Sequence, residues 1–328
     1  MQETNSNINA IFGPGRSGTT WLGSMINAHP DIAYRFEPFT RQKRDATIQK
    51  CKAELREGHL TTEARKTLYD LLLLAHPLTD KPPFFKKSYA KGKRLKTWLW
   101  RAARGFPPLR VIYSAAHSAP SGTPVVFKDV GSMTARGFAQ ATDIPLIYLA
   151  RHPCATVVSH VVGQESGRMP TGRVQAFASL LLAHDPKLYE SLAPHFAHMN
   201  EYQKNALVWR INVETVMESL ELRPNTMLMT YEQLCDEPFA HVSRILSHFG
   251  LDFAPEVERF ILSLLNDGGT NAAKPRGRKR NYFSVFRNPK TQRDKWKSRV
   301  PTDISDQIID LVADSESVQT LASAGGWW

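Results

Sequence analysis

A short apolar run that opens directly into a glycine-rich loop is the feature of this sequence that most restricts its fold. The run is Ile8–Phe12, and the loop that follows reads Gly-Pro-Gly-Arg-Ser-Gly-Thr-Thr over residues 13–20. Beyond the loop, apolar residues at positions 22, 25 and 26 have the spacing of one helix face. A strand, a glycine loop and a helix in this order form a cradle whose backbone N–H groups bind phosphate. The sequence therefore predicts an α/β fold with a phosphate site beside its first strand.

The loop keeps the glycine spacing of the P-loop that binds nucleoside triphosphates, but it lacks the lysine. Gly13 and Gly18 occupy the two glycine positions, Thr19 stands where the lysine would be, and Thr20 takes the position of the hydroxyl that holds Mg²⁺. Arg16 adds a planar cation within the loop. We therefore expect the loop to bind a phosphate group without a metal ion.

Four further apolar runs each end at a polar residue. Ala33–Phe36 leads to Glu37, residues 125–127 lead to Lys128, Leu146–Ala150 leads to Arg151, and residues 227–230 lead to Tyr231. Helical patterns separate the runs, which indicates a parallel sheet. Ligands of such sheets bind beyond the carboxyl ends of the strands, so these side chains are expected at one cleft. The predicted fold is α/β, a P-loop-like three-layer α/β/α architecture with a central parallel sheet.

The chain of 328 residues is expected to form a single domain with two additions. Residues 40–123 are a mostly helical and basic insertion between the second and third runs, and we predict that they cap the cleft. Residues 268–300 are predicted to form a basic lid over the bound nucleotide. Helices are expected over residues 61–74, 174–184, 202–220 and 239–249, where apolar residues recur at three- and four-residue steps.

A second anion site is predicted where the run Leu146–Ala150 ends. Arg151 is followed by Pro153, which suits the first turn of a helix, and then by Ser159. This spacing places a guanidinium group and a hydroxyl group on adjoining turns at a helix start. Taken alone, Arg151 could equally pair with an acid while Ser159 faces the solvent. Together with the glycine loop, the two residues indicate a ligand with two anionic groups.

These two motifs resemble those of the sulfotransferase family, which uses 3′-phosphoadenosine 5′-phosphosulfate (PAPS). In that family, a loop of the form Arg/Lys-Ser-Gly-Thr/Ser-Thr/Ser binds the 5′-phosphosulfate, and a strand followed by Arg-x-Pro-x-x-x-x-x-Ser binds the 3′-phosphate. Residues 16–22 match the first motif, and Arg151 with Ser159 matches the second. The continuation to Glu37 and Pro38 is similar to carbohydrate and tyrosyl-protein sulfotransferases. The resemblance covers residues 8–39 and 124–253, and more weakly residues 282–300.

The resemblance implies PAPS as the donor co-substrate, with no metal, and it gives a role to each matching residue. Tyr231 belongs to an element like the family's Tyr-Glu-x-Leu, whose tyrosine lies near the adenine. Arg287 and Lys290 lie in a C-terminal element that resembles the family's basic closure over the nucleotide. The donor contacts are thus expected from Gly15, Arg16, Ser17, Gly18, Thr19, Thr20, Trp21, Arg151, Ser159, Tyr231, Arg287 and Lys290.

Two carboxyl groups are candidates for the general base. Small-molecule sulfotransferases carry Lys-Thr-His after the strand that precedes the 3′-phosphate motif, and the matching positions here are Lys128, Asp129 and Val130. Because the histidine is lost, Glu37 is expected to take the acceptor's proton, as its counterpart does in carbohydrate and tyrosyl-protein relatives. Asp129 is the alternative base. Lys128 is expected to bond the bridging oxygen and to stabilise the leaving phosphate.

Positive charge is concentrated in two segments. The formal net charge is +11, and residues 81–110 hold ten Lys/Arg and no acid, whereas residues 274–299 hold eleven Lys/Arg and one acid. Such segments fit a solvated surface, a funnel for an anionic ligand or, where aromatic residues are interleaved, a nucleic-acid surface. The glycine loop leaves a P-loop-type kinase as one alternative to the sulfotransferase. The basic segments leave a non-catalytic polyanion- or nucleic-acid-binding protein as another. No nucleic-acid partner is expected.

Composition and cysteine usage indicate a cytoplasmic protein. The sequence has no apolar run long enough to span a bilayer, residues 1–7 lack the pattern of a secretory signal, and three widely spaced cysteines fit neither a disulfide framework nor a zinc site. The acceptor is predicted to be a hydroxyl on a carbohydrate or glycoconjugate, because the Glu-Pro continuation and the basic insertion favour one. A lipid, a small alcohol and a peptide tyrosine stay open.

Overall fold

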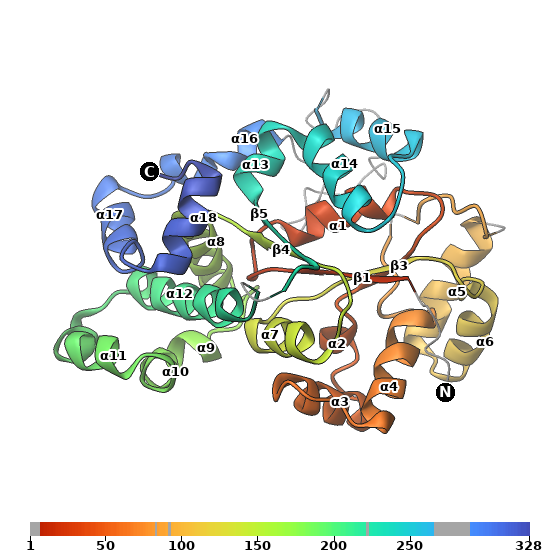
Figure 1. Cartoon of the computed structure of the whole chain (residues 1–328), viewed down its shortest axis with the longest axis horizontal. Coiled ribbons are helices and arrows are strands. Elements are labelled where there is room, and N and C mark those ends of the chain that lie inside the picture. Colours follow the sequence, from red (N-terminus) through yellow and green to blue (C-terminus); the bar gives the residue numbers. More distant parts are fainter. Residues whose placement is uncertain (1–6, 83, 91–92, 221–222, 266–288) are drawn as a thin grey trace.

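The computed structural model describes residues 7–82, 84–90, 93–220, 223–265 and 289–328. Its centre is a five-stranded sheet in the order β2-β3-β1-β4-β5, in which every pair of neighbours is parallel (Figure 1). The five predicted strands are confirmed, with one extra residue each in β3 and β5. They are β1 (Ile8–Phe12), β2 (Ala33–Phe36), β3 (Val125–Lys128), β4 (Leu146–Ala150) and β5 (Thr226–Thr230).

Helices cover both faces of the sheet, which confirms the three-layer architecture (Figure 1). One face carries α1 (Thr19–Asn27), α14 (Pro238–His248) and α15 (Pro255–Leu265). The other face carries α7 (Ser132–Ala141), α8 (Pro153–Glu165) and α12 (Glu201–Leu220). Every residue of β1, β2, β3 and β4 is buried. Strands covered on both faces read as continuous apolar runs, which explains why they are visible in the sequence.

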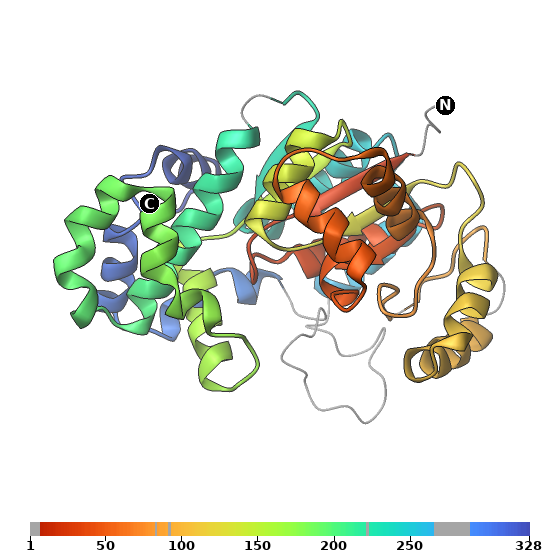
Figure 2. The same cartoon turned by 90° about the horizontal axis from the view of Figure 1, so that it is seen from below.

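The insertion between β2 and β3 folds as helices. They are α2 (Pro38–Arg41), α3 (Ala46–Arg56), α4 (Thr62–Leu73), α5 (Lys93–Gly105) and α6 (Pro108–His117). Helices α3 and α4 join the core that also holds α7 and α12. Helices α5 and α6 form a hairpin with a small apolar cluster of their own, made by Ala75, Leu99, Ala103 and Tyr113. The hairpin lies at the opposite end of the molecule from α10 and α11 (Figures 1 and 2).

The rest of the described chain adds short helices around α12 and the C-terminal segment. They are α9 (Gly172–Gln175), α10 (Phe177–His184), α11 (Pro186–Leu192), η1 (Ala193–His198), α13 (Tyr231–Asp236), α16 (Pro289–Arg293), η2 (Lys295–Ser298), α17 (Thr302–Asp310) and α18 (Glu316–Gly325). The single helix expected over residues 174–184 was wrong, because Ala176 (φ −95°, ψ 13°) leaves helical geometry and separates α9 from α10. In the described ranges, no helix is both long and apolar enough to cross a membrane.

The strand register brings the carboxyl ends of the strands side by side. Lys128 is paired with Phe36 on one side and with Ile11 on the other, and Ala150 is paired with Thr230. The residues that end the strands or follow them directly therefore line one edge in the order Glu37, Lys128, glycine loop, Arg151 and Tyr231. Neighbouring positions along this edge are about 4.8 Å apart, the spacing of hydrogen-bonded strands.

Candidate active site

The glycine loop turns sharply before α1 begins. Arg16 and Gly18 have positive φ values of 72° and 95°, and Gly18 is the N-cap residue of α1. A Cβ atom at Gly18 would lie 2.3 Å from Cδ2 of Tyr231, so both the backbone conformation and the available space require glycine. The helix has no side-chain cap and no acidic residue in its first turn. Its N-terminal N–H groups and helix dipole therefore favour an anion at this position.

Among the buried polar atoms that have no hydrogen-bond partner within the described chain, two belong to the predicted anion motifs. One is Oγ of Ser17, which is fully buried in the loop, and the other is Nε of Arg151. A buried donor without a partner costs stability unless a ligand or water satisfies it. The loop and the residue after β4 thus both fit a ligand that carries two anionic groups. The predicted residues Thr19, Thr20 and Trp21 make up the first turn of α1, directly after Ser17 and Gly18.

The two anion motifs of the sequence lie in direct contact. Arg16 donates from Nε to Oγ of Ser159 at 2.9 Å, across 143 residues of sequence. Nε2 of His160 lies 3.0 Å from the carbonyl oxygen of Gly15. Ser159 and His160 belong to α8, so this helix joins the glycine loop to the second motif.

Arg151 extends from the end of β4 across the ring of Tyr231. Its Cζ lies 4.3 Å from the centroid of that ring, and its guanidinium donates to the carbonyl oxygens of Gln292 (2.7 Å) and Arg16 (3.5 Å). Trp21 packs edge-on against Tyr231, with ring centroids 5.6 Å apart. Burial raises the pKa of Tyr231 above its usual range, so the phenol is neutral. Arg151 is therefore held as a fixed cation beside the loop.

A close ion pair occupies the other end of the edge. Nζ of Lys128 donates to Oε1 of Glu37 at 2.6 Å, and Nε of Arg41 lies 3.4 Å from Oε2. Burial alone would raise the pKa of Glu37, but the neighbouring charges of Lys128, Arg41 and Lys81 lower it overall. The carboxylate is therefore ionised at neutral pH. Glu37 also has a φ of 50°, a strained conformation that often marks functional positions.

Asp129 is adjacent to this pair but its oxygens are engaged. It is fully buried, and it accepts hydrogen bonds from the backbone N–H groups of Phe39 (2.9 Å) and Val130 (2.7 Å) and from the hydroxyl of Thr40 (3.0 Å). Burial raises its pKa to about 6. These bonds fix the turn from β2 into α2, on which Glu37 stands. Asp129 thus holds Glu37 in place.

The family of the chain follows from a match to a known protein family. The profile described as the sulfotransferase family matches residues 10–255. The chain belongs to the sulfotransferase family. The predicted family and enzyme class are therefore confirmed, and among curated protein sequences none matches the chain.

Solved structures with a similar fold include the sulfotransferase domain from the curacin biosynthetic pathway, with 16% identity, a TM-score of 0.45 and coverage of 94% of this chain and 98% of that chain. Mouse sulfotransferase SULT7A1 complexed with PAP has 15% identity, a TM-score of 0.45 and coverage of 97% and 88%. Retinol dehydratase in a complex with retinol and PAP has 15% identity, a TM-score of 0.40 and coverage of 96% and 82%. These likenesses concern the fold alone.

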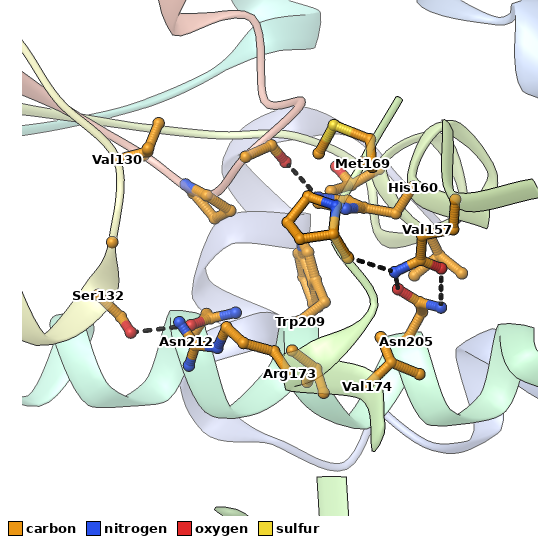
Figure 3. Close-up of a pocket in the computed structure, with 18 of the residues that line it drawn as sticks. Val130, Ser132, Val157, His160, Met169, Arg173, Val174, Asn205, Trp209 and Asn212 are labelled. Atoms are coloured by element: carbon orange, nitrogen blue, oxygen red, sulfur yellow. Dashed lines mark hydrogen bonds between the residues drawn. The ribbon is translucent and has the colours of Figure 1, made fainter. Parts of the chain in front are cut away.

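The sulfotransferase has a cavity of about 250 Å³ beside its glycine loop (Figure 3). Val130, Ser132, His160, Arg173 and Asn212 line it, together with other residues of the loop, the turn after β3, α8, α9 and α12. Its walls are mostly apolar and carry a few polar groups, as in many small-molecule sites. The described lining residues fall within 13–15 and 130–212, so the insertion does not form this cavity.

Two buried groups on the cavity wall are without hydrogen-bond partners in the structure as described. They are Oγ1 of Thr156 and Nε1 of Trp209. Sequence reasoning missed both residues, because a threonine and a tryptophan inside amphipathic helices read as core. The sequence alone does not show that these two residues lie beside the glycine loop.

The insertion reaches the sulfotransferase site at the Glu37 end. Nζ of Lys81 lies 3.8 Å from the ring centroid of Phe36, and burial, with repulsion by Lys128, lowers the pKa of Lys81 to about 8. The insertion therefore adds a cation close to the Glu37–Lys128 pair. That it caps the cleft stays a prediction, as does the single-domain organisation.

Glu232, the acid of the predicted Tyr-Glu-x-Leu element, is buried near Arg151, and no role of its own was predicted for it. Glu232 accepts hydrogen bonds from Nε1 of Trp327 (2.9 Å) and from the backbone N–H of His152 (3.3 Å). The His152 ring stacks on Trp296 with centroids 4.5 Å apart, and burial lowers its pKa to about 3, so the ring is neutral. These contacts fix the residues next to Arg151 and Tyr231. Trp327 matched no motif, so the sequence held no signal for it.

Some predicted contacts lie outside the described residues. Arg287 and most of the predicted lid over residues 268–300 are among them, and the side chain of Lys290 is not described although its backbone belongs to α16. Within the part of the chain that is described, no cluster of three His, Cys, Asp or Glu side chains could hold a metal ion.

Proposed function

We propose that this sulfotransferase transfers the sulfuryl group of PAPS to a hydroxyl of a carbohydrate or glycoconjugate, with Glu37 as the general base and Lys128 as the group that stabilises the leaving phosphate. The observation that carries the proposal is the 2.6 Å Glu37–Lys128 pair at the ends of β2 and β3, next to the glycine loop. An acid and a base side chain in contact beside a phosphate cradle are what sulfuryl transfer to a hydroxyl requires.

The donor site is proposed to span the loop and the end of β4. The N-terminal N–H groups of α1, with Ser17, Thr19 and Thr20, bind the 5′-phosphosulfate. Arg151 and Ser159 bind the 3′-phosphate, and Arg16 lies between them because it bonds Ser159 at 2.9 Å. Support comes from the unsatisfied donors of Ser17 and Arg151 at these two positions.

The reaction is proposed to be an in-line displacement without a metal ion. Glu37 accepts the proton of the acceptor hydroxyl while that oxygen forms a bond to sulfur. The bond from sulfur to the 5′-phosphate oxygen breaks, and Lys128 neutralises the charge that develops on the phosphate. When Lys128 turns towards the donor, Glu37 loses a cationic neighbour and becomes a stronger base. Lys128 thereby couples donor binding to proton removal.

Glu37 is favoured over Asp129 as the base for a geometric reason. The oxygens of Asp129 already accept three hydrogen bonds from Phe39, Thr40 and Val130, and the residue is fully buried. Glu37 is partly exposed at the edge, with its side chain 14% accessible. A base must reach the acceptor, so the more accessible carboxylate fits the role.

The cavity beside the loop supports a carbohydrate acceptor that extends beyond the reacting hydroxyl, because neither Glu37 nor Lys128 is among the residues that line it. Trp209, Thr156, Asn212 and Ser132 line it, so it offers several hydrogen-bonding groups together with apolar surface. A polyhydroxylated ring can satisfy several such groups at once, whereas a monohydric alcohol satisfies one or two. Arg173 adds a cation that suits an acidic glycan. The three cysteines are free and buried, which supports the proposal of a cytoplasmic location.

Calorimetric titration with 3′-phosphoadenosine 5′-phosphate (PAP), the spent donor, tests the donor site. The wild type is expected to bind PAP, and Arg151→Ala to bind it more weakly. Transfer from labelled PAPS to heparosan and chondroitin oligosaccharides, with 2-naphthol as an apolar alcohol, then tests the acceptor. Absence of PAP binding by the wild type would refute the donor site, and sulfation of 2-naphthol alone would refute the carbohydrate acceptor.

A further inference from the structure

The α5–α6 hairpin carries a concentration of exposed apolar side chains. Ten large hydrophobic residues are exposed in the described chain, and five of them lie within this hairpin and its turn. They are Leu95 (66% exposed), Trp98 (65%), Phe106 (57%), Val111 (74%) and Ile112 (55%). Scattered exposed apolar residues are normal, but a cluster of this kind marks an interaction site.

The outer face of α6 is entirely apolar. Its exposed residues are Pro108, Val111, Ile112, Ala115 and Ala116, whereas Tyr113 points inward and is fully buried. On α5, Leu99 and Ala103 are buried, and the exposed face presents Leu95 and Trp98 beside arginines. The inward faces therefore account for the folding of the hairpin, and the outer apolar faces remain to be explained.

The hairpin is anchored firmly, so its outer faces are held in a fixed orientation. Asp80 is buried, and it joins Arg35 of β2 (3.3 Å) to Lys96 of α5 (3.1 Å). It also accepts a hydrogen bond from the hydroxyl of Tyr113 on α6 (2.6 Å), and its carbonyl accepts one from Trp100 (3.0 Å). A single buried carboxylate thus ties both helices to the sheet.

The charges around the apolar faces all have one sign. From Arg94 to Ala116, every exposed residue is apolar except Arg94, Arg101 and Arg104. The sequence holds no Asp or Glu between Asp80 and Asp129. Arginines beside tryptophan and aliphatic side chains are the composition of helices that lie in the interface of an anionic membrane.

We infer that the α5–α6 hairpin docks the protein on an anionic lipid bilayer, with Trp98, Val111 and Ile112 in the headgroup region and the arginines on lipid phosphates. A second copy of the chain fits less well, because a two-fold interface would set the arginines of one hairpin against those of the other. An anionic glycan would bind the arginines but leave the outer face of α6 in water. This inference concerns where the enzyme works and does not depend on the transfer chemistry.

Co-sedimentation with vesicles tests the docking. Wild-type protein is expected to bind vesicles made of equal parts phosphatidylcholine and phosphatidylglycerol at least about tenfold more tightly than phosphatidylcholine alone, and to be released by salt. Trp98→Ser with Ile112→Ser is expected to weaken binding by about tenfold or more. Arg94→Gln, Arg101→Gln and Arg104→Gln together should weaken it by roughly a hundredfold.

The matched control is Leu182→Ser with Leu262→Ser, which removes two apolar residues that are 48% and 39% exposed elsewhere on the surface. It should bind vesicles like the wild type, and all variants should retain the wild-type melting temperature. Three results overturn the inference: no vesicle binding by the wild type, unchanged binding by the serine variant of the hairpin, or a solution dimer that the same variant dissociates. The arginine variant keeps the test valid if the serine variant is unstable.

Discussion

The two ends of the candidate active-site edge hold their charges in opposite ways. At the β2–β3 end, Lys128 and Glu37 are paired with each other at 2.6 Å, so each charge is balanced by a group that can change partners. At the β4–β5 end, the cation of Arg151 lies on the Tyr231 ring, and the nearby acid Glu232 is bound by the N–H groups of Trp327 and His152. The first end is suited to moving a proton, and the second to presenting a fixed positive charge.

This difference matters for Glu232, an acid that lies close to the proposed 3′-phosphate site. An ionised Glu232 would repel a 3′-phosphate bound at the proposed site, and the N–H donors of Trp327 and His152 disperse its charge without using the guanidinium of Arg151. Burial raises the pKa of Glu232, whereas Arg151 and the N–H donors of Trp327 and His152 lower it, and burial has the larger effect. The raised pKa favours the neutral carboxyl group, which would repel a phosphate less. With the proposed roles, the edge separates catalysis from binding, and substitutions at the two ends should affect different measured quantities.

The largest expected effect is that of Glu37→Gln on turnover. The amide keeps the size and the bond to Lys128 but cannot accept a proton, so kcat should fall by about 10²- to 10⁴-fold. PAP affinity measured by calorimetry should stay within about twofold, because the substitution leaves the β4–β5 end unchanged. Glu57→Gln, at the C-cap of α3, is the control and should behave as the wild type. Unchanged turnover in Glu37→Gln would rule out this residue as the base.

The second effect is that of Arg151→Ala on PAP binding. The substitution removes charge-assisted hydrogen bonds, which are worth about 1.5 to 3 kcal/mol each, so affinity should fall by roughly 10- to 100-fold. At saturating PAPS, kcat should change much less than in Glu37→Gln. Arg259→Ala on α15 removes an arginine that is 69% exposed and serves as the control. Equal PAP affinity in Arg151→Ala and the wild type would contradict the assignment of the 3′-phosphate site.

The sequence predicted this edge because the relevant signals are local. Lys128 ends its strand, and Glu37, Arg151 and Tyr231 each follow theirs directly. Parallel strands place such residues together whatever the helices do. The glycine loop was also visible in the sequence, because the positive φ of Gly18 (95°) requires a glycine at that position.

What the sequence could not supply are contacts between distant segments. Trp327 reaches Glu232 across 95 residues, and no spacing rule links them. The choice between Glu37 and Asp129 also needed the structure, because only the hydrogen bonds from Phe39 and Thr40 show that the oxygens of Asp129 are engaged. Likewise, the basic composition of residues 81–110 gave no indication of which apolar side chains face outward.

A moderate effect on stability is expected for Trp327→Phe. The substitution removes the indole donor and leaves Oε2 of Glu232 buried without that partner, so the free energy of unfolding should fall by about 1–3 kcal/mol in urea denaturation. Trp100→Phe is the matched control, since it removes a 3.0 Å bond from a half-buried indole to the backbone carbonyl of Asp80, a neutral acceptor, and should cost less. An equal loss of free energy of unfolding in both variants would contradict the expectation that the Trp327–Glu232 hydrogen bond stabilises the β4–β5 end more than an ordinary indole bond does.

The smallest effect separates the two candidate bases by pH. The pKa of Glu37 is lowered from its ordinary value of 4.5, so its carboxylate remains ionised as the pH falls from 7 to 5. With Glu37 as the base, kcat/KM should change by less than about twofold over this range. With Asp129 as the base, whose pKa is about 6, only about a tenth of the molecules would carry the ionised base at pH 5. A roughly tenfold loss of kcat/KM between pH 7 and 5, in protein that stays folded, would therefore move the proton-accepting role to Asp129 and leave Glu37 as the partner of Lys128.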